Sequence, residues 1–539
     1  MESVSDRTVE ESRAARDALR SAWRDAGFYA PATIADAIET GAATCPDDLM
    51  IFSPVDGDEH AATLAEIQRA AVQLAGRLAA TGLGAGDAVI IQSAADGASV
   101  EALSALWRLG AVVVPIVAGA STDDVAHVAA ETGARTAIVP ASWRGSDIAA
   151  PLVAAAAGIG LDRVLVLGDD APPGATPLAA LPDGPTPDRS SVRPDSVACV
   201  IYTSGSTAAP KGVRHSHETM LFGLTLGPGD GRTLVTFPAG HVAAVIGLLR
   251  PLCAGGLTVV LDRWSARAAV EAIETHRITA SSGTPFFLAT LLDEAERTGR
   301  DIDSLERFLC GAAAVPPELL ARAADAGIIS WRTYGSTEHP AVCTSDPDTP
   351  ADKRHHTDGH PIPLTEVRLV DTDGRDVAAG DEGQILTRGP RQFLGYQDPS
   401  LDAEAFLDTW FGTGDLGRLD ADGYLIVTDR VKDIVIRGGE NISASEVESA
   451  LASHPTLVEA AVIATPDPLF GEQVCAVVVV GPGSTAPSAD DLARHCERHG
   501  LAAHKRPTEV RVVDELPRTS AGKVRKAELR AAQSGVDLH

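Results

Sequence analysis

The segment IYTSGSTAAPKGVRHSH, residues 201–217, places hydroxyl side chains and glycines directly in front of Lys211. Small residues let a backbone approach phosphate oxygens closely and a lysine adds a cation, so this composition is typical of a phosphate-binding loop. The spacing is not that of Walker A, because Gly212 follows Lys211 where Walker A has a hydroxyl residue. Such a segment on its own is more often a solvated turn, so its function has to be judged from the rest of the chain.

The elements around this loop predict an α/β protein. Helical patterns alternate with short apolar runs between about residues 60 and 167, and a second alternation begins with the apolar strand at 197–202 that delivers the loop. Such alternation predicts mostly parallel, doubly wound sheets, which bind ligands at the carboxyl ends of their strands. The chain is β-rich after about residue 360 and ends in a small α+β pattern. We therefore expect a large N-terminal domain of two doubly wound sheets plus a β-rich subdomain, followed by a small, mobile α+β C-terminal domain.

Length and composition limit the kinds of partner. A chain of 539 residues is too long for one hydrophobic core, and a net charge of −29 disfavours nucleic acid or an anionic membrane as partner. The seven cysteines are scattered without a C-x-x-C pair, which is typical of reduced thiols. The N-terminal residues do not suit a signal peptide, and no apolar stretch is long enough for a membrane helix. We expect a cytoplasmic enzyme without membrane insertion, and a homodimer is left open.

Four further segments occur in a fixed order after the loop: RTYGSTEH (332–339), WFGTGDLG (410–417), DRVKDIVIRGGENISASEVE (429–448) and PRTSAGKVRK (517–526). With these five motifs, nearly the whole chain resembles the adenylate-forming superfamily, which includes acyl- and aryl-CoA ligases, luciferases and the adenylation domains of peptide synthetases. The resemblance implies that a carboxylic acid reacts with ATP to give an acyl-adenylate and pyrophosphate, with Mg²⁺ as cofactor. Coenzyme A (CoA) would then accept the acyl group on its thiol.

The resemblance also implies roles for the motif residues. The β- and γ-phosphates of ATP would be held by Thr203, Ser204, Gly205, Ser206, Thr207 and Lys211. In the segment Tyr334-Gly335-Ser336-Thr337-Glu338, the tyrosine would flank the adenine, Thr337 would contact the α-phosphate and Glu338 would hold Mg²⁺. The small residues Gly311, Ala312 and Ala313 would make room for the flat base. Asp415 and Arg430 would contact the ribose, because a carboxylate pairs well with a diol.

The C-terminal motifs imply a change of conformation between two half-reactions. Lys523 would bridge the carboxylate and the α-phosphate during adenylation, since its long stem and compact charge suit a group delivered from another domain. The resemblance places a hinge at Lys432, which divides the chain into a domain at 1–429, a hinge at 430–432 and a domain at 433–539. In the second conformation, the loop that contains Gly438 and Gly439 would replace Lys523 and line a tunnel for the thiol of CoA.

The acid itself is less well defined. His241 occupies a place near the carboxylate in relatives, although a buried core histidine is an equal alternative. Small residues such as Ala244 and Gly283 leave room for a ring, so we expect an aryl, cinnamyl-like or alicyclic acid. The chain has Ala208 where the family usually has glycine, so another acceptor or oxyacid stays open: a carrier protein, an amine, or nitrite for diazotisation. A non-catalytic nucleotide-binding relative is the remaining alternative.

Overall fold

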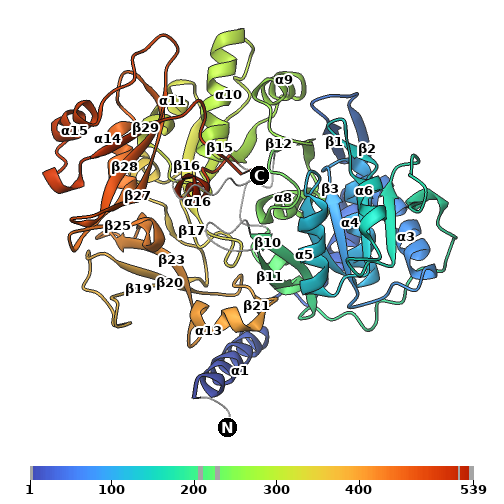
Figure 1. Cartoon of the computed structure of the whole chain (residues 1–539). Coiled ribbons are helices and arrows are strands. Elements are labelled where there is room, and N and C mark those ends of the chain that lie inside the picture. The colour runs from blue at the N-terminus through green and yellow to red at the C-terminus, as the bar shows by residue number, and fades with distance from the viewer. Residues whose placement is uncertain (1–3, 204–209, 225–230, 520–521, 533–539) are drawn as a thin grey trace.

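The computed structural model describes residues 4–203, 210–224, 231–519 and 522–532. Two large sheets form the body of the molecule, and two smaller sheets follow them in the chain (Figure 1). The N-terminal helix α1 (Val4–Asp25) lies at the bottom of the view, next to helix α13 (Asp402–Ala405). No helix within the described ranges is both long and apolar enough to cross a membrane.

The first large sheet has eight strands in the order β21-β11-β10-β4-β3-β5-β8-β9. Its strands from β10 to β9 run parallel to their neighbours, whereas β11 is antiparallel to both β10 and β21. The strands are β3 (Ala88–Ser93), β4 (Val112–Val117), β5 (Thr136–Pro140), β8 (Arg163–Leu167), β9 (Thr176–Pro177), β10 (Val197–Thr203), β11 (Lys211–Ser216) and β21 (Gly395–Tyr396). The helices between and around them are α3 (Leu64–Ala80), α4 (Gly97–Leu109), α5 (Thr122–Thr132), α6 (Ala149–Ala155) and α7 (His217–Leu221).

The second large sheet has nine strands in the order β18-β17-β16-β15-β14-β12-β13-β1-β2. The pairs from β16 to β1 are parallel, and β2, β17 and β18 add antiparallel edges. The strands are β1 (Leu49–Ser53), β2 (His60–Thr63), β12 (Arg232–Val235), β13 (Leu257–Leu261), β14 (Ala280–Gly283), β15 (Arg307–Gly311), β16 (Ile329–Tyr334), β17 (Cys343–Thr344) and β18 (His360–Pro361). The accompanying helices are α8 (Val242–Ala254), α9 (Ala266–His276), α10 (Pro285–Thr298), α11 (Pro317–Asp325) and α12 (Ala351–His356).

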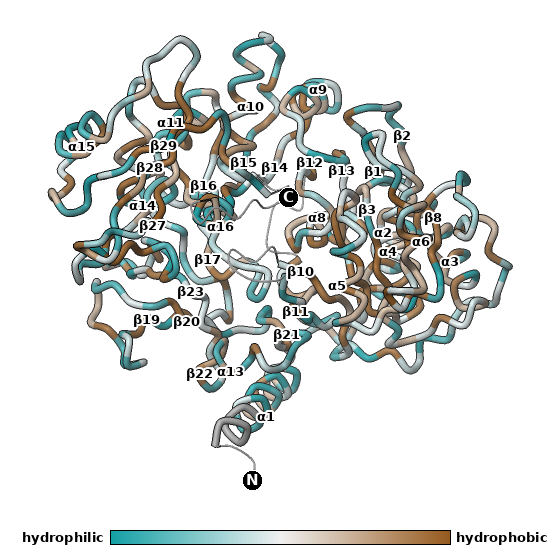
Figure 2. The backbone as a smooth tube through the Cα atoms, in the orientation of Figure 1, coloured by the Kyte–Doolittle hydropathy of each residue, from teal (hydrophilic) through white to brown (hydrophobic). Residues whose placement is uncertain are grey.

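Burial of apolar side chains holds the two large sheets together. The largest core cluster joins residues of β1, β3, β4, β10 and β13 with helices α2 (Ile34–Thr44), α3, α4 and α8. One further cluster packs α9, α10 and α11 on the nine-stranded sheet, and another packs α5 and α6 on the eight-stranded sheet. Figure 2 shows hydrophobic residues concentrated around β3, α2 and α4. Both sheets are therefore covered by helices, as expected for doubly wound sheets.

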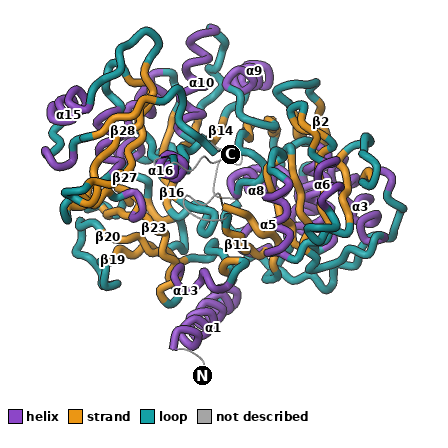
Figure 3. The backbone as a smooth tube through the Cα atoms, in the orientation of Figure 1, coloured by secondary structure: helices purple, strands orange, loops and turns teal. Residues whose placement is uncertain are grey.

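Two smaller sheets complete the chain, in a part where strands and loops predominate (Figure 3). The third sheet contains β19 (Glu366–Val370), β20 (Gly383–Arg388), β22 (Phe406–Leu407), β23 (Trp410–Leu419) and β24 (Leu425–Arg430). The C-terminal sheet contains β25 (Val435–Arg437), β26 (Glu440–Ile442), β27 (Leu457–Asp467), β28 (Gly471–Val480) and β29 (Glu509–Val512), with helices α14 (Ala444–Leu451), α15 (Ala489–Arg498) and α16 (Lys526–Ala531). The predicted fold class is confirmed by this arrangement and by the structural relatives described below.

Two strands join a different sheet from the one that their place along the chain suggests. Strand β10, which begins the predicted second alternation, belongs to the first sheet, where it pairs with β4. Trp107 of α4 is buried and donates a hydrogen bond from its indole to the Ala198 carbonyl oxygen at 3.3 Å, which holds β10 on this sheet. Strand β1 comes before the first alternation, yet it pairs with β13 of the second sheet. Order along the chain therefore did not reveal which sheet each strand joins.

Candidate active site

The predicted phosphate loop joins two paired strands. Thr203, the last residue of β10, is directly opposite Lys211, the first residue of β11. The Lys211 ammonium lies 5.2 Å from the centre of the Tyr396 ring, on the neighbouring strand β21. The predicted contacts from Ser204, Gly205, Ser206 and Thr207, and the departure at Ala208, lie outside the described residues. The described ends of the loop therefore fix Lys211 beside Tyr396.

Glu338 follows strand β16 and lies against the same tyrosine. The Tyr396 hydroxyl donates a hydrogen bond to Glu338 Oε1 at 2.8 Å, and the Phe393 N–H donates to the Glu338 carbonyl oxygen at 2.8 Å. Burial and the nearby Glu338 carboxylate raise the pKa of Tyr396, so the phenol stays protonated and remains a donor. Lys211, Tyr396 and Glu338 therefore form one polar unit that comes from three separate segments.

The backbone around Thr337 is held by a buried histidine. His215 Nε2 lies 2.8 Å from the Thr337 carbonyl oxygen, and His215 Nδ1 lies 3.2 Å from the Thr219 hydroxyl. Burial lowers the pKa of His215 to about 4, so the ring is neutral at pH 7 and donates from Nε2 to the carbonyl. Ser336 Oγ accepts a hydrogen bond from the His339 N–H at 3.3 Å, which closes the turn. This turn is thus shaped by protein contacts before any ligand binds.

Asp415 is the centre of a second polar unit. Its side chain is buried on β23, where Oδ2 accepts a hydrogen bond from the Tyr334 hydroxyl at 2.7 Å. Its other oxygen, Oδ1, accepts from Arg430 Nε at 2.8 Å, and the two residues are directly opposite each other in the β23–β24 hairpin. A carboxylate oxygen can accept more than one hydrogen bond, so Asp415 can still accept hydrogen bonds from the two hydroxyls of a diol.

The glycines next to these two polar units are explained by the packing of the protein itself. A Cβ added to Gly311 would lie 2.6 Å from Thr333 Cγ2, and one added to Gly335 would lie 2.5 Å from the Ala341 nitrogen. Gly311 is therefore required for the close packing of β15 on β16, and Gly335 for the close approach of the chain around Ala341, whatever ligand binds. Ala312 adopts a left-handed conformation with φ of 66°, which costs least for a small residue. Ala312 and Ala313 are both exposed, so the backbone at 311–313 presents an open surface.

Lys523 is delivered by a tight turn of the C-terminal segment. Arg518 and Val524 form an antiparallel bridge across this turn, and Thr519 Oγ1 accepts a hydrogen bond from the Lys523 N–H at 3.2 Å. Burial and, to a lesser extent, the charge of Arg430 lower the pKa of Lys523 to about 8, whereas Asp415 and Glu338 act in the opposite direction. These effects require proximity, so the structure brings Lys523 together with both polar units.

An apolar cluster lies beside Lys523. Gly522, with φ of 81°, packs against helix α10, because an added Cβ would lie 3.0 Å from Phe286 Cδ1. Around this point Phe237, Ala244 and Phe287 are buried, and Trp264 stacks on Phe287 with ring centres 4.3 Å apart. His241 lies at the edge of the cluster, 6.3 Å from the Phe237 ring centre. Burial, and to a lesser extent Lys523, lower the pKa of His241 to about 4, so this histidine is neutral at pH 7.

Three predicted residues lie outside this constellation. Gly438 and Gly439 have φ of 61° and 90° and form the two-residue turn of the β25–β26 hairpin, beside Phe470. Positive φ at both positions is the geometry of a type I′ turn, which favours glycine. Lys432 is exposed in the short 3₁₀ helix Val431–Asp433 that connects β24 to β25. The structure therefore places Lys523 at the site and leaves the Gly438–Gly439 turn outside it.

Two residues of the site were missed by sequence reasoning. Tyr396 contacts both Lys211 and Glu338, and His215 supports Thr337, yet the motifs gave no role to either residue. His215 is within the opening segment at 201–217, where strand alternation puts it on the same side of β11 as Lys211. Tyr396 is one of only five tyrosines in the chain, and its rarity is the one signal that the sequence offers.

Two family models and several known proteins match the sequence of this chain. A family model described as AMP-binding enzyme matches residues 38–397, and one described as AMP-binding enzyme C-terminal domain matches residues 446–523. A feruloyl-CoA synthase of Amycolatopsis sp is 35% identical over 87% of this chain and 94% of that protein. A medium-chain fatty-acid–CoA ligase of Escherichia coli is 30% identical over 95% of this chain and 92% of that protein.

A crystal structure of an anthranilate CoA ligase in complex with anthranoyl-AMP has a TM-score of 0.84 to this chain. Its sequence is 25% identical, and the match covers 94% of this chain and 98% of that one. The order of the motifs, the convergence of Lys523 with Asp415 and Glu338, and these likenesses all point the same way. The chain belongs to the AMP-binding enzyme family and is an adenylate-forming enzyme of the acid–CoA ligase type.

Proposed function

We propose that this enzyme converts a carboxylic acid and ATP into an acyl-adenylate and pyrophosphate, and then transfers the acyl group to the thiol of CoA. The observation that carries the proposal is the convergence of Lys523, from the C-terminal segment, with Glu338 and Asp415 of the N-terminal part. Charge develops where the acid oxygen attacks the α-phosphate, and a cation held there in a water-poor site stabilises the transition state. Lys523 supplies that cation.

The polar units suit the parts of ATP. Asp415 would accept hydrogen bonds from the ribose hydroxyls while Arg430 and Tyr334 keep its carboxylate in place, and Tyr334 would flank the adenine over the open backbone at 311–313. Lys211 and the loop that follows Thr203 would hold the β- and γ-phosphates. Thr337 would contact the α-phosphate from a turn that His215 fixes. Pre-positioned groups of this kind lower the barrier without reorganising during the reaction.

The residues present also fit Mg²⁺. In the described part of the chain, no cluster of three or more His, Cys, Asp and Glu side chains could hold a metal ion by itself. Mg²⁺ is usually bound by one or two carboxylates together with substrate phosphates and water, so the lone carboxylate of Glu338 is the expected donor. The Tyr396 hydroxyl would orient Glu338 for this task. When bound, Mg²⁺ neutralises charge on the phosphates of ATP.

The surroundings of Lys523 favour an aromatic or alicyclic acid. Its neighbours Phe286 and Trp264 are partly exposed aromatic rings, and Phe287 and Ala244 are buried behind them in the same apolar cluster. His241 is neutral and therefore provides a hydrogen bond rather than a charge. We therefore propose an aryl, cinnamyl-like or alicyclic substrate.

A panel of acids tests this proposal by pyrophosphate release. Ferulate, cinnamate, salicylate, anthranilate, cyclohexanecarboxylate and octanoate are each incubated with ATP and Mg²⁺, with and without CoA, and the products are identified by mass spectrometry. We expect release with at least one ring-bearing acid and a thioester only when CoA is present. A product on a carrier protein or an amine, formed equally well without CoA, would replace CoA as the acceptor. AMP formation that depends on nitrite would replace the carboxylic acid as the activated oxyacid. AMP formation from none of the acids would refute the enzymatic assignment.

The low pKa of Lys523 predicts a pH dependence. The charged ammonium is the form that assists adenylation, and its pKa is lowered to about 8, chiefly by burial. We therefore expect kcat/KM for pyrophosphate release to fall as pH rises through about 8, because kcat/KM reports ionisations of the free enzyme. In Lys523→Arg, whose guanidinium stays protonated, the residual activity should lack this decline. A decline that persists unchanged in Lys523→Arg would assign the ionisation to another group.

We also propose that the chain divides into a domain at 1–429, a hinge at 430–432 and a domain at 433–539. Asp429, before the hinge, accepts hydrogen bonds from the Ser443 hydroxyl at 2.6 Å and the Ser445 N–H at 3.2 Å, after the hinge. Few such contacts would have to exchange for the later segment to turn. Rotation about Lys432 would withdraw Lys523 and bring the Gly438–Gly439 turn towards the site for transfer to CoA.

A proline at the hinge separates the two half-reactions. Proline fixes φ near −65°, which suits the 3₁₀ turn observed at Lys432 but opposes a large change of backbone angle. In Lys432→Pro we expect adenylation within about threefold of the wild type, and thioester formation from acyl-adenylate reduced by about tenfold or more. Single-turnover measurements of each half-reaction give the comparison, with Lys432→Ala as control. Equal losses in both half-reactions would contradict the hinge.

A further inference from the structure

Helix α1 presents a row of arginines to the body of the protein. Arg13, Arg16, Arg20 and Arg24 are three or four residues apart and therefore share one face of the helix. Arg16 and Arg20 are buried: Arg16 pairs with Asp402 at 3.0 Å, and Arg20 donates to the Phe393 carbonyl oxygen at 2.7 Å. Burying charged side chains costs free energy, so this face of α1 serves a purpose other than keeping the protein soluble.

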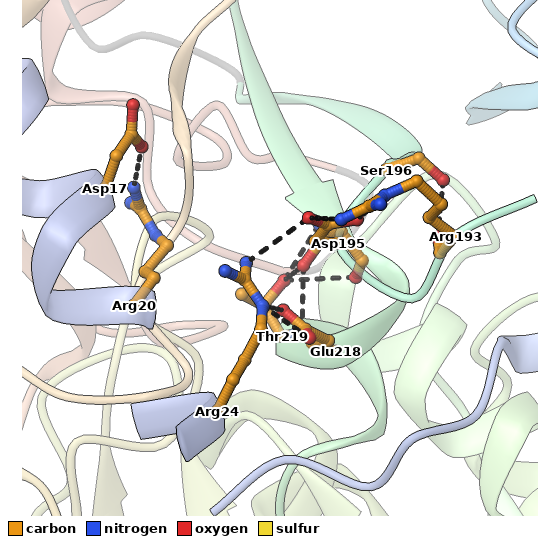
Figure 4. A network of polar contacts seen from close by, with 9 residues as sticks. Asp17, Arg20, Arg24, Arg193, Asp195, Ser196, Glu218 and Thr219 are labelled. Atoms are coloured by element: carbon orange, nitrogen blue, oxygen red, sulfur yellow. Dashed lines mark hydrogen bonds and ion pairs between the residues drawn. The ribbon is translucent and has the colours of Figure 1, made fainter. Parts of the chain in front are cut away.

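The same face forms one wall of a cavity of about 230 Å³. The cavity is lined by Arg13, Asp17, Arg20, Arg24, Asp195, Arg214 and Leu394. Figure 4 shows Arg24 directed towards Asp195 and Glu218, and Arg20 paired with Asp17. Asp195 is held by a bidentate contact from Arg193, with both bonds at 2.9 Å. The carboxylates at this cavity therefore already have arginine partners.

Two guanidinium groups that line the cavity have no partner among the described residues. Among the described residues, Arg13 and Arg214 make no side-chain hydrogen bond and no ion pair, although Arg214 is largely buried. Burial lowers the pKa of Arg214, and the charge of Arg13 lowers it further. Two like charges that approach each other at a cavity favour an anion between them. Four arginines against two aspartates give the lining an excess of positive charge, in a chain whose net charge is −29.

This cavity is separate from the proposed ATP site. Side chains alternate along a strand, so Lys211 and His215 share one side of β11 and Arg214 points to the other. Lys211 and His215 face Tyr396 and Thr337, whereas Arg214 faces the cavity beneath α1. A ligand of the cavity would thus lie behind the strand pair that carries the phosphate loop.

We propose that this cavity binds a small phosphate-bearing anion, with a phosphate group between Arg13 and Arg214. The planar guanidinium matches phosphate oxygens through paired N–H donors, and arginine is the residue most used for such recognition. The volume admits one or two phosphate groups with part of an attached organic group. The phosphate could come from an inorganic anion, such as the pyrophosphate that the proposed reaction releases, or from a nucleotide. The inference stands independently of the proposed function.

Isothermal titration of the full chain tests the site with three probes: inorganic phosphate, pyrophosphate and adenosine 3′,5′-bisphosphate. We expect at least one probe to show a saturable binding event that weakens about tenfold or more in the double variant Arg13→Gln/Arg214→Gln. The control Arg135→Gln changes an exposed arginine whose partner is Asp162, and because neither residue lines the cavity it should bind within about twofold of the wild type. Tighter binding of pyrophosphate would identify an inorganic source, and tighter binding of the bisphosphate a nucleotide source.

Folding and the ATP site provide the remaining controls. Arg13 is exposed, so Arg13→Gln alone keeps the test valid if the double variant does not fold. The KM for ATP should stay within about twofold in all of these variants, which separates the cavity from the proposed ATP site. Absence of saturable binding by all three probes, or equal affinity in Arg13→Gln and the wild type, would overturn the proposal.

Discussion

Replacing Lys523 by alanine is expected to reduce the rate of adenylate formation by about a hundred- to a thousandfold, the usual cost of removing one preorganised group that stabilises developing charge. The structure supports a specific effect, because the ammonium lies in the field of Asp415, Glu338 and Arg430. The binding of ATP should change little, since Asp415, Tyr334 and Lys211 all remain. Pyrophosphate release in the presence of a saturating acid gives the rate, and equilibrium titration gives the affinity for ATP.

The second half-reaction supplies an internal control for Lys523→Ala. If Lys523 leaves the site before transfer, thioester formation from a synthetic acyl-adenylate and CoA should stay within about threefold of the wild type. Arg525→Ala removes an exposed cation two residues away, whose partner is Glu528 at 2.6 Å, and should leave both half-reactions intact. Retention of more than about a third of the adenylation rate in Lys523→Ala would refute the proposed role.

The sequence located the site through motifs, each of which is local. The motifs at 332–339, 410–417 and 517–526 were recognised separately, and their order alone predicted the family, which the comparisons confirmed. The roles of the individual residues stay predictions. Contacts between segments could not be predicted from the sequence. The Tyr396–Glu338 hydrogen bond joins residues 58 positions apart, and nothing in either local sequence specifies it.

The fold, like the site, could be predicted only where the signal is local in the sequence. The short apolar runs between about residues 60 and 167 include the strands β3, β4, β5 and β8, because hydrophobic periodicity is local. The sheet that each strand joins depends on tertiary partners, which is why β10 was assigned to the wrong alternation and β1 to neither. The arginines of α1 were likewise unremarkable in sequence, since a charged helix face usually meets water. Only the burial of Arg16 and Arg20 sets this helix apart.

The second large effect is expected from Asp415→Asn, which keeps the shape of the side chain and removes its charge. Asp415 receives hydrogen bonds from Tyr334 and Arg430 in the described structure, and the ribose of ATP would add two more. Hydrogen bonds to a charged group contribute about 1.5–3 kcal/mol each, so loss of the charge should raise the KM for ATP by about ten- to a hundredfold. The ribose does not react, so kcat should fall much less than the affinity.

A matched control lies on the same hairpin. Asp422 occupies the exposed turn between β23 and β24, where it pairs with Lys353 at 2.6 Å, so Asp422→Asn removes an identical charge from the same element. An ion pair this exposed contributes little, and the KM for ATP should be unchanged. A 2′-deoxy-ATP substrate completes the test: it should be a poor substrate for the wild type and for Asp422→Asn, whereas Asp415→Asn should discriminate little between the two nucleotides. If Asp415→Asn still preferred ATP by the wild-type factor, the carboxylate would not be the group that reads the ribose.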